Sequence, residues 1–179
     1  MRRIVAYAFV AAVAAAPAAV AGKKPVMPDF VPELTPFVGT WKNRVQTRKK
    51  KVNLWLVIRE KDGKLQLRFQ NPIREKKYTS GWDGQIELTM QVNIKQKRET
   101  RYRVATEPVR IEVSDLWRYT GSWKNRKTRV EAVYELTDDG KLSYTCKSLV
   151  DVTEDEEKPL PCFSPFVYER ISDKTKWPD

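Results

Sequence analysis

The chain has 179 residues, of which 41% are hydrophobic and 11% aromatic, enough to bury one core and to exclude a disordered chain. Its 34 lysines and arginines outnumber its 23 acidic residues, and the net charge of +11 favours anionic partners over basic ones. The sequence has no histidine, which excludes histidine-ligated metals, histidine-containing catalytic triads and histidine pH switches. The 2 cysteines cannot hold zinc or an iron–sulfur cluster alone, so we expect no metal and no other cofactor.

The first 21 residues have the pattern of a secretory signal peptide. Two arginines follow Met1, residues 4–20 form an Ala/Val-rich apolar run, and Ala19-Val20-Ala21 resembles a cleavage site. Pro17 interrupts the run, and its small residues favour cleavage over a membrane anchor. We therefore expect residues 1–21 to be removed and the mature protein to be exported, periplasmic or extracellular, with no membrane-spanning segment.

Residues 22–37 are rich in proline and predict an extended lead-in with one helical turn near Pro32. From 38 to 172 the hydrophobic period is two, as in β-strands, and residues 173–179 form a C-terminal tail. Alternation throughout 85–94 predicts one strand there. Asp-Gly pairs at 62–63, 83–84 and 139–140 predict hairpin turns between strands. The apolar faces of the other strands are Val52, Leu54, Leu56 and Ile58; Leu65, Leu67 and Phe69; Val109, Ile111 and Val113; Val130, Ala132, Tyr134 and Leu136.

The succession of these strands predicts an all-β domain. About eight to ten short antiparallel strands in an up-and-down meander, apolar on one face, favour a closed barrel, because closure removes exposed sheet edges. A β-sandwich is the alternative. An outer-membrane barrel fits less well, because the strands look short for spans of about 9–11 residues.

The two cysteines are predicted to form a disulfide. Cys146 lies in the strand-like segment 142–150, Cys162 begins the segment 162–171, and an acidic loop separates them. A hairpin centred near Glu154 places the two opposite each other. In an oxidising compartment, a bridge that closes a loop of this size stabilises the fold by about 3 kcal/mol.

The segment Phe37-Val38-Gly39-Thr40-Trp41 resembles the opening motif of lipocalins, an aromatic lead-in followed by G-x-W. More broadly it resembles the calycin superfamily, which includes lipocalins, fatty-acid-binding proteins and avidins. In these folds the tryptophan closes the barrel floor and a late arginine packs across it. The resemblance thus implies a lipocalin-like barrel closed by Gly39, Trp41 and Arg170, with a cation–π contact between the last two.

An internal echo accompanies this motif. Trp41-Lys-Asn-Arg44 recurs as Trp123-Lys-Asn-Arg126, and each copy is followed by a strand and an Asp-Gly-Lys-Leu turn. Two half-barrel repeats would explain the echo, and convergent hairpin chemistry is the alternative.

A barrel of this size has room for one small ligand when its interior is not fully packed. We therefore expect a binding protein for a small apolar or amphipathic ligand. We do not expect an enzyme, because spacing singles out no pair of acid–base groups. The residues predicted to line the pocket are Phe69, Met90, Tyr134 and Phe166.

Clusters of basic residues support an alternative function. In that interpretation a non-enzymatic, envelope-associated protein uses cationic hairpin loops to bind anionic polymers, lipids or a protein partner. Solvated turns and edge protection by lysine are the plainer explanation of the same clusters. Nucleic acid is not an expected partner, because no recognised binding motif is present. The cations assigned to the anionic partner are Arg48, Lys49, Lys50, Lys51, Arg98 and Arg101.

Overall fold

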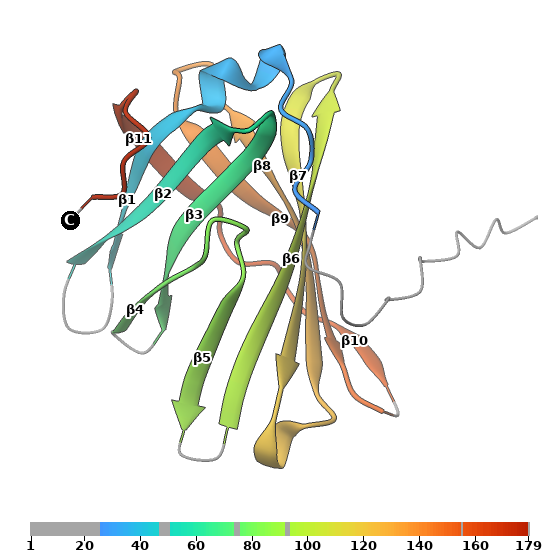
Figure 1. The fold of residues 1–179 in the computed structure, drawn as a ribbon. Helices are drawn as coiled ribbons and strands as arrows, with labels where there is room; N and C mark the ends of the chain where they lie inside the picture. The colour runs from blue at the N-terminus through green and yellow to red at the C-terminus, as the bar shows by residue number, and fades with distance from the viewer. Residues whose placement is uncertain (1–25, 47–50, 74–75, 92–93, 155, 179) are drawn as a thin grey trace, which may run out of the picture.

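The computed structural model describes residues 26–46, 51–73, 76–91, 94–154 and 156–178. The predicted signal peptide, residues 1–21, lies outside these residues. The strands form one antiparallel sheet that curls into a nearly closed barrel (Figure 1). The strands are β1 (Gly39–Gln46), β2 (Lys51–Lys61), β3 (Lys64–Ile73), β4 (Lys76–Thr79), β5 (Ile86–Gln91), β6 (Ile94–Thr106), β7 (Val109–Tyr119), β8 (Lys127–Leu136), β9 (Leu142–Val152), β10 (Glu157–Pro159) and β11 (Phe166–Ser172); the 3₁₀-helices are η1 (Pro32–Phe37) and η2 (Gly121–Trp123).

The strand order confirms the predicted up-and-down meander and rules against the sandwich. It runs β4-β3-β2-β1-β11-β9-β8-β7-β6-β5, with the short β10 paired to β9 at the side. Most neighbours in this order are consecutive strands; the exceptions are at β11, which pairs with both β1 and β9. The strands β4 and β5 are the two ends of this order, so the barrel has a seam between them.

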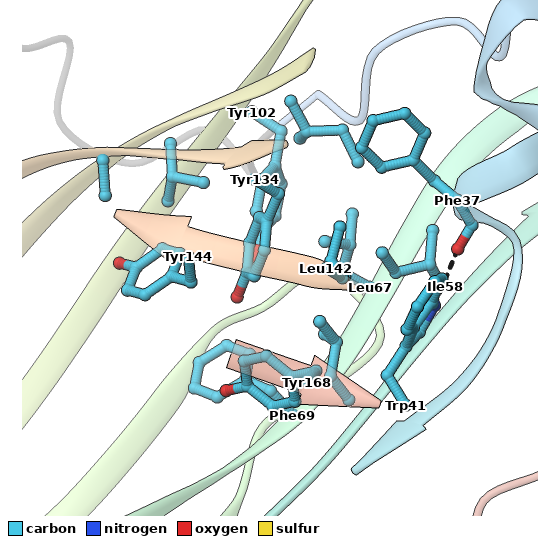
Figure 2. Packing of buried hydrophobic residues seen from close by; sticks show 14 of the residues in the cluster. Phe37, Trp41, Ile58, Leu67, Phe69, Tyr102, Tyr134, Leu142, Tyr144 and Tyr168 are labelled. Atoms are coloured by element: carbon cyan, nitrogen blue, oxygen red, sulfur yellow. Dashed lines mark hydrogen bonds between the residues drawn. The ribbon is translucent and has the colours of Figure 1, made fainter. Parts of the chain in front are cut away.

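Period-two alternation places the apolar faces inside, as predicted. Leu56, Ile58, Leu65, Leu67 and Ile111 are completely buried. The helix η1 adds Leu34 and Phe37 to the same cluster at one end of the barrel. Figure 2 shows Phe37 and Trp41 beside Ile58 at this end, while Tyr134 and Tyr144 lie farther along the interior. The end that carries η1 is therefore plugged by side chains.

Closure between β1 and β11 takes the form that the resemblance implies. Trp41 pairs with Arg170, and the Arg170 guanidinium lies 5.4 Å from the centre of the indole ring. Arg170 also donates a hydrogen bond to the Val38 carbonyl, and the Trp41 indole N–H donates to the Phe37 carbonyl at 2.8 Å. Gly39 has a φ of +149°, and a Cβ there would lie 2.8 Å from the Ser172 carbonyl oxygen. Only glycine allows the two strands to approach so closely.

Two predicted elements are wrong in detail. The segment 85–94 is not one strand, because β5 ends at Gln91 and Ile94 begins β6 and pairs with it. Alternation in the sequence continues across residues 92–93, which lie outside the described residues, so the period alone does not show that one strand ends and another begins. The Asp83-Gly84 turn forms no hairpin either, since it links β4 to β5 across the seam. Gly84 is required there, because a Cβ would lie 2.1 Å from the Tyr102 hydroxyl.

The two Trp-Lys-Asn-Arg segments occupy different structures. Trp41 is fully buried in β1, whereas Trp123 lies in η2 at the opposite end of the barrel and is 36% exposed. The echo therefore does not correspond to two equivalent half-barrels.

The C-terminal tail packs onto the barrel rather than extending from it. The Thr40 hydroxyl donates a hydrogen bond to the Lys174 carbonyl at 2.6 Å. The Arg68 guanidinium lies 4.7 Å from the centre of the Trp177 ring. Thr40 and Arg68 both pair with Val57, which is completely buried. The tail thus covers the outer face of β1, β2 and β3.

The predicted disulfide is confirmed. Cys146 in β9 and Cys162 are bonded, with their Cα atoms 5.6 Å apart. The turn between β9 and β10 falls at residues 153–156, where the sequence places it. The second strand, however, begins only at Phe166, because Pro161 and Pro165 keep the residues after β10 irregular.

We expect the Trp41–Arg170 contact to stabilise the fold. Trp41→Ala should lower the free energy of unfolding by about 3–5 kcal/mol, since it empties a buried site. Arg170→Ala should cost about 1–2 kcal/mol, because it removes the stacking contact and one hydrogen bond. Urea unfolding of the single and double variants should show coupling between the two sites. Arg101→Ala, on an exposed position of β6, is the control, and an equal effect of the two arginine variants would contradict the assignment.

The disulfide should also contribute measurably. Its cysteines are 16 residues apart, so the Cys146→Ala/Cys162→Ala variant should lose about 3 kcal/mol of unfolding free energy through the entropy of its unfolded chain. The measurement is urea unfolding of both proteins, with the reduced wild type as a second comparison. Equal stability of oxidised and reduced protein would contradict this expectation.

Candidate functional site

A cavity of about 290 Å³ lies inside the barrel, away from η1. Gly39, just after η1, pairs with Ile58, whereas the cavity reaches β2 at Leu54, toward the opposite end of that strand. Three of the residues predicted to form a pocket wall, Phe69, Tyr134 and Phe166, line this cavity; the side chain of the fourth, Met90, lies outside the described part of the structure. The complete lining is Leu54, Phe69, Gln70, Arg98, Asp115, Trp117, Val130, Tyr134, Tyr144, Phe163, Phe166 and Tyr168.

Part of the wall comes from the irregular segment that the disulfide holds in place. Phe163 follows Cys162 directly, and its ring centre lies 5.9 Å from that of Tyr144 and 5.5 Å from that of Phe166. Leu160 donates a backbone hydrogen bond to the Leu149 carbonyl in β9. The disulfide therefore positions one aromatic wall residue that no strand carries.

A buried ion pair interrupts this aromatic lining. Arg98 on β6 and Asp115 on β7 form a salt bridge, and their side chains are 7% and 2% exposed. The Arg98 guanidinium lies 4.3 Å from the centre of the Phe69 ring and 5.3 Å from that of Trp117. The Tyr144 hydroxyl lies 3.5 Å from the Asp115 carboxylate. The charge of Arg98 is thus balanced by one carboxylate and packed against two aromatic faces.

Electrostatics favour the charged form of Arg98. Burial by itself lowers the pKa of Arg98, but the neighbouring Asp115 carboxylate and Tyr144 outweigh burial, and the pKa of Arg98 is raised. Breaking such a pair leaves an uncompensated buried charge, which is strongly unfavourable.

Several polar atoms around the pair have no hydrogen-bond partner among the described residues. They are Arg98 Nε, Asp115 Oδ1, Gln70 Oε1 and Gln96 Oε1. Buried polar groups in folded proteins are nearly always paired, so each of these atoms calls for a partner. Arg98, Asp115 and Gln70 line the cavity, whereas Gln96 does not, so the site has one unpartnered donor and two unpartnered acceptors next to an apolar surface.

Four tyrosines surround the same interior. Burial raises the pKa of Tyr102, Tyr144 and Tyr168 well above the ordinary value, and the positive charge of Arg98 only partly opposes it. Burial likewise raises the pKa of Tyr134. These phenols remain protonated at physiological pH.

The cations predicted to bind an anionic partner lie in different places. Arg98 is inside the barrel, which corrects its assignment to an exposed cluster. Lys51 and Arg101 are exposed, at the start of β2 and on the outer face of β6. The remaining three, Arg48, Lys49 and Lys50, lie outside the described residues.

The alternation of side chains along β6 and β7 is a sequence signal for the buried pair. Asp115 is separated by an even number of residues from Ile111 and Val113, which lie on the inward face of its strand. Arg98 is likewise separated by an even number of residues from the buried Tyr102. Side chains separated by an even number of residues lie on the same face of a strand. This alternation separates Arg98 from the neighbouring surface lysines.

No known protein family, no curated protein and no solved structure matches the chain. Within the described residues, no group of three or more cysteine and acidic side chains is placed to hold a metal ion. The helices of that part of the chain are all too short or too polar to cross a membrane.

The buried tyrosines predict instability at high pH. In the unfolded chain they ionise near pH 10, whereas in the folded protein they keep their protons to higher pH. Above pH 10 the folded state therefore binds more protons, and the free energy of unfolding should fall by about 1.4 kcal/mol per pH unit for each such tyrosine.

Urea unfolding between neutral pH and pH 11.5 measures this slope. Tyr168→Phe removes one phenol and keeps the ring. The free energy of unfolding of this variant should therefore fall less steeply with pH, by the contribution of one tyrosine. If the slope were the same in the variant and the wild type, Tyr168 would have the same pKa in the folded and the unfolded protein, which would contradict the prediction.

Proposed function

We propose that the chain is an exported, lipocalin-like barrel of the calycin type that binds a small apolar or amphipathic ligand in its interior. The single observation that carries this proposal is the cavity of about 290 Å³ with its aromatic lining. Pockets for small molecules are typically concave, mostly apolar and supplied with a few convergent polar groups. Arg98 and Asp115 are such groups.

The difference between the two ends of the barrel supports the same function. Leu34, Phe37 and Trp41 fill the end at η1, so a ligand there would have to displace a packed core. The cavity lies toward the other end, between Leu54 and Phe166. The G-x-W motif and the Trp41–Arg170 stack support the calycin-like assignment, because the resemblance predicts that contact.

Export is part of the proposal. The N-terminal 21 residues have the composition of a signal peptide, and a disulfide persists in oxidising compartments. A periplasmic or extracellular location would bring the barrel into contact with envelope lipids and small amphipathic molecules.

The alternative, docking through cationic loops, has weaker support. Two other cations near the end of the barrel opposite η1 pair with carboxylates: Arg126 lies 2.6 Å from Asp151, and Arg129 lies 2.6 Å from Glu157. Such pairs reduce the local positive potential that would attract an anionic surface. We therefore favour the interior as the binding site.

Filling the cavity should abolish binding. Val130 is a buried residue of the cavity wall, and Val130→Phe places a ring in the space that a ligand would occupy. We expect the wild type to bind the uncharged fluorophore 1-naphthylamine, with little dependence on salt, and the variant to lose this binding. Fluorescence titration measures both. Val167→Phe, at an exposed position of β11, is the matched control and should bind normally.

The contrary results are equally clear. If native mass spectrometry of protein purified from its own envelope found no small molecule, and the fluorophore found no site, the barrel would be a solid scaffold. Binding to anionic vesicles that weakens steeply from low to physiological salt would then favour the cationic loops.

A further inference from the structure

The Arg98–Asp115 pair carries more information about the ligand than the apolar wall does. Both side chains line the cavity, both are more than nine-tenths buried, and each retains an unpartnered polar atom, Arg98 Nε and Asp115 Oδ1. Gln70, also in the lining, retains an unpartnered Oε1. The side chains that line the cavity thus carry one unpartnered donor and two unpartnered acceptors. A ligand group that both accepts and donates a hydrogen bond matches this set.

The charge balance of the pair constrains that group further. Arg98 and Asp115 neutralise each other. An anionic ligand would bring a second negative charge beside Asp115, and a cationic ligand a second positive charge beside Arg98. Either charge would be desolvated without a counterion of its own, which is costly in a buried site. The cavity therefore favours an uncharged head group.

The size and lining of the cavity describe the rest of the ligand. An apolar protein cavity of about 150 Å³ holds one benzene ring, so 290 Å³ corresponds to about twelve non-hydrogen atoms. Phe69, Tyr134, Tyr144 and Phe163 supply flat surfaces around this space. Aromatic walls pack well against a flat ring system.

We propose that the cavity binds an uncharged ligand with a flat apolar body of about two rings and one hydroxyl or amide group, which accepts from Arg98 and donates to Asp115. This inference rests on the proposed function, because it assumes that the cavity is the binding site. It adds the chemical class of the ligand and names the two residues that select it.

A series of probes with one common body tests the selection. Isothermal titration calorimetry at neutral pH compares 2-naphthol, naphthalene, the anion 2-naphthoate and the cation 2-naphthylmethylammonium. We expect 2-naphthol to bind at least about tenfold more tightly than each of the others, because only it satisfies both unpartnered atoms without adding charge.

The outcomes separate this inference from the proposed function. If naphthalene or either ion binds as tightly as 2-naphthol, the cavity binds ligands but the selection by Arg98 and Asp115 is wrong. If none of the four binds and 1-naphthylamine finds no site either, the proposed function fails, and this inference with it.

Changing the charge balance should change the preference. Asp115→Asn leaves the Arg98 charge without its carboxylate, and the carboxylate of 2-naphthoate can then take that place. We expect 2-naphthoate to bind this variant at least about tenfold more tightly than it binds the wild type, and to raise its Tm more. Asp151→Asn, which removes the carboxylate of the ion pair with Arg126 away from the cavity, should keep the preference for 2-naphthol. An unchanged preference in Asp115→Asn would overturn the assignment.

A second variant keeps the test valid if Asp115→Asn does not fold. Arg98→Met/Asp115→Leu replaces the pair by apolar side chains of similar size, a change that buried ion pairs often tolerate. We expect this protein to bind naphthalene at least as tightly as 2-naphthol. A retained tenfold preference for 2-naphthol would show that other groups recognise the hydroxyl.

Discussion

The pairing of the first strand with the last is the constraint on which the rest of the structure depends. A meander of antiparallel strands would otherwise present two long unpaired edges, and the contact of β1 with β11 brings its ends together. Three residues make that contact possible: Gly39 allows the close approach, and Trp41 and Arg170 fill the junction. Because the junction lies beside η1, the same residues also determine which end of the barrel is plugged.

Closure creates an interior with two unlike ends. At the end near η1, Phe37 and Trp41 pack in one cluster with aliphatic residues and are almost completely buried. Toward the other end, large aromatic rings replace the aliphatic side chains, and their shapes leave a cavity. Arg98 and Asp115 belong to that second region, where a buried ion pair is tolerated because aromatic faces and phenols surround it. The buried ion pair and the cavity therefore lie in the same region of the barrel.

The disulfide links this region to the outer part of the fold. Segment 160–165 lacks strand pairing of its own, apart from a backbone hydrogen bond at Leu160. The bond between Cys146 and Cys162 fixes the segment against β9, and Phe163 completes the aromatic wall. A covalent constraint is an effective way to position a side chain that the sheet does not hold.

The sequence by itself determined the class of the fold, because alternation with a period of two and Asp-Gly turns are local signals. It also predicted the disulfide and the closure contact, since compartment, spacing and a short motif identify both. It did not reveal the turn between β5 and β6, where alternation continues on both sides. The role of Arg98 was decided only by the tertiary structure, because a basic residue among lysines looks like a surface residue until its cross-strand neighbours are known. Asp115 lies on β7, the hairpin partner of β6, whereas Phe69 lies on β3 in a distant part of the sheet, and the curling of the sheet into a barrel brings Phe69 against Arg98.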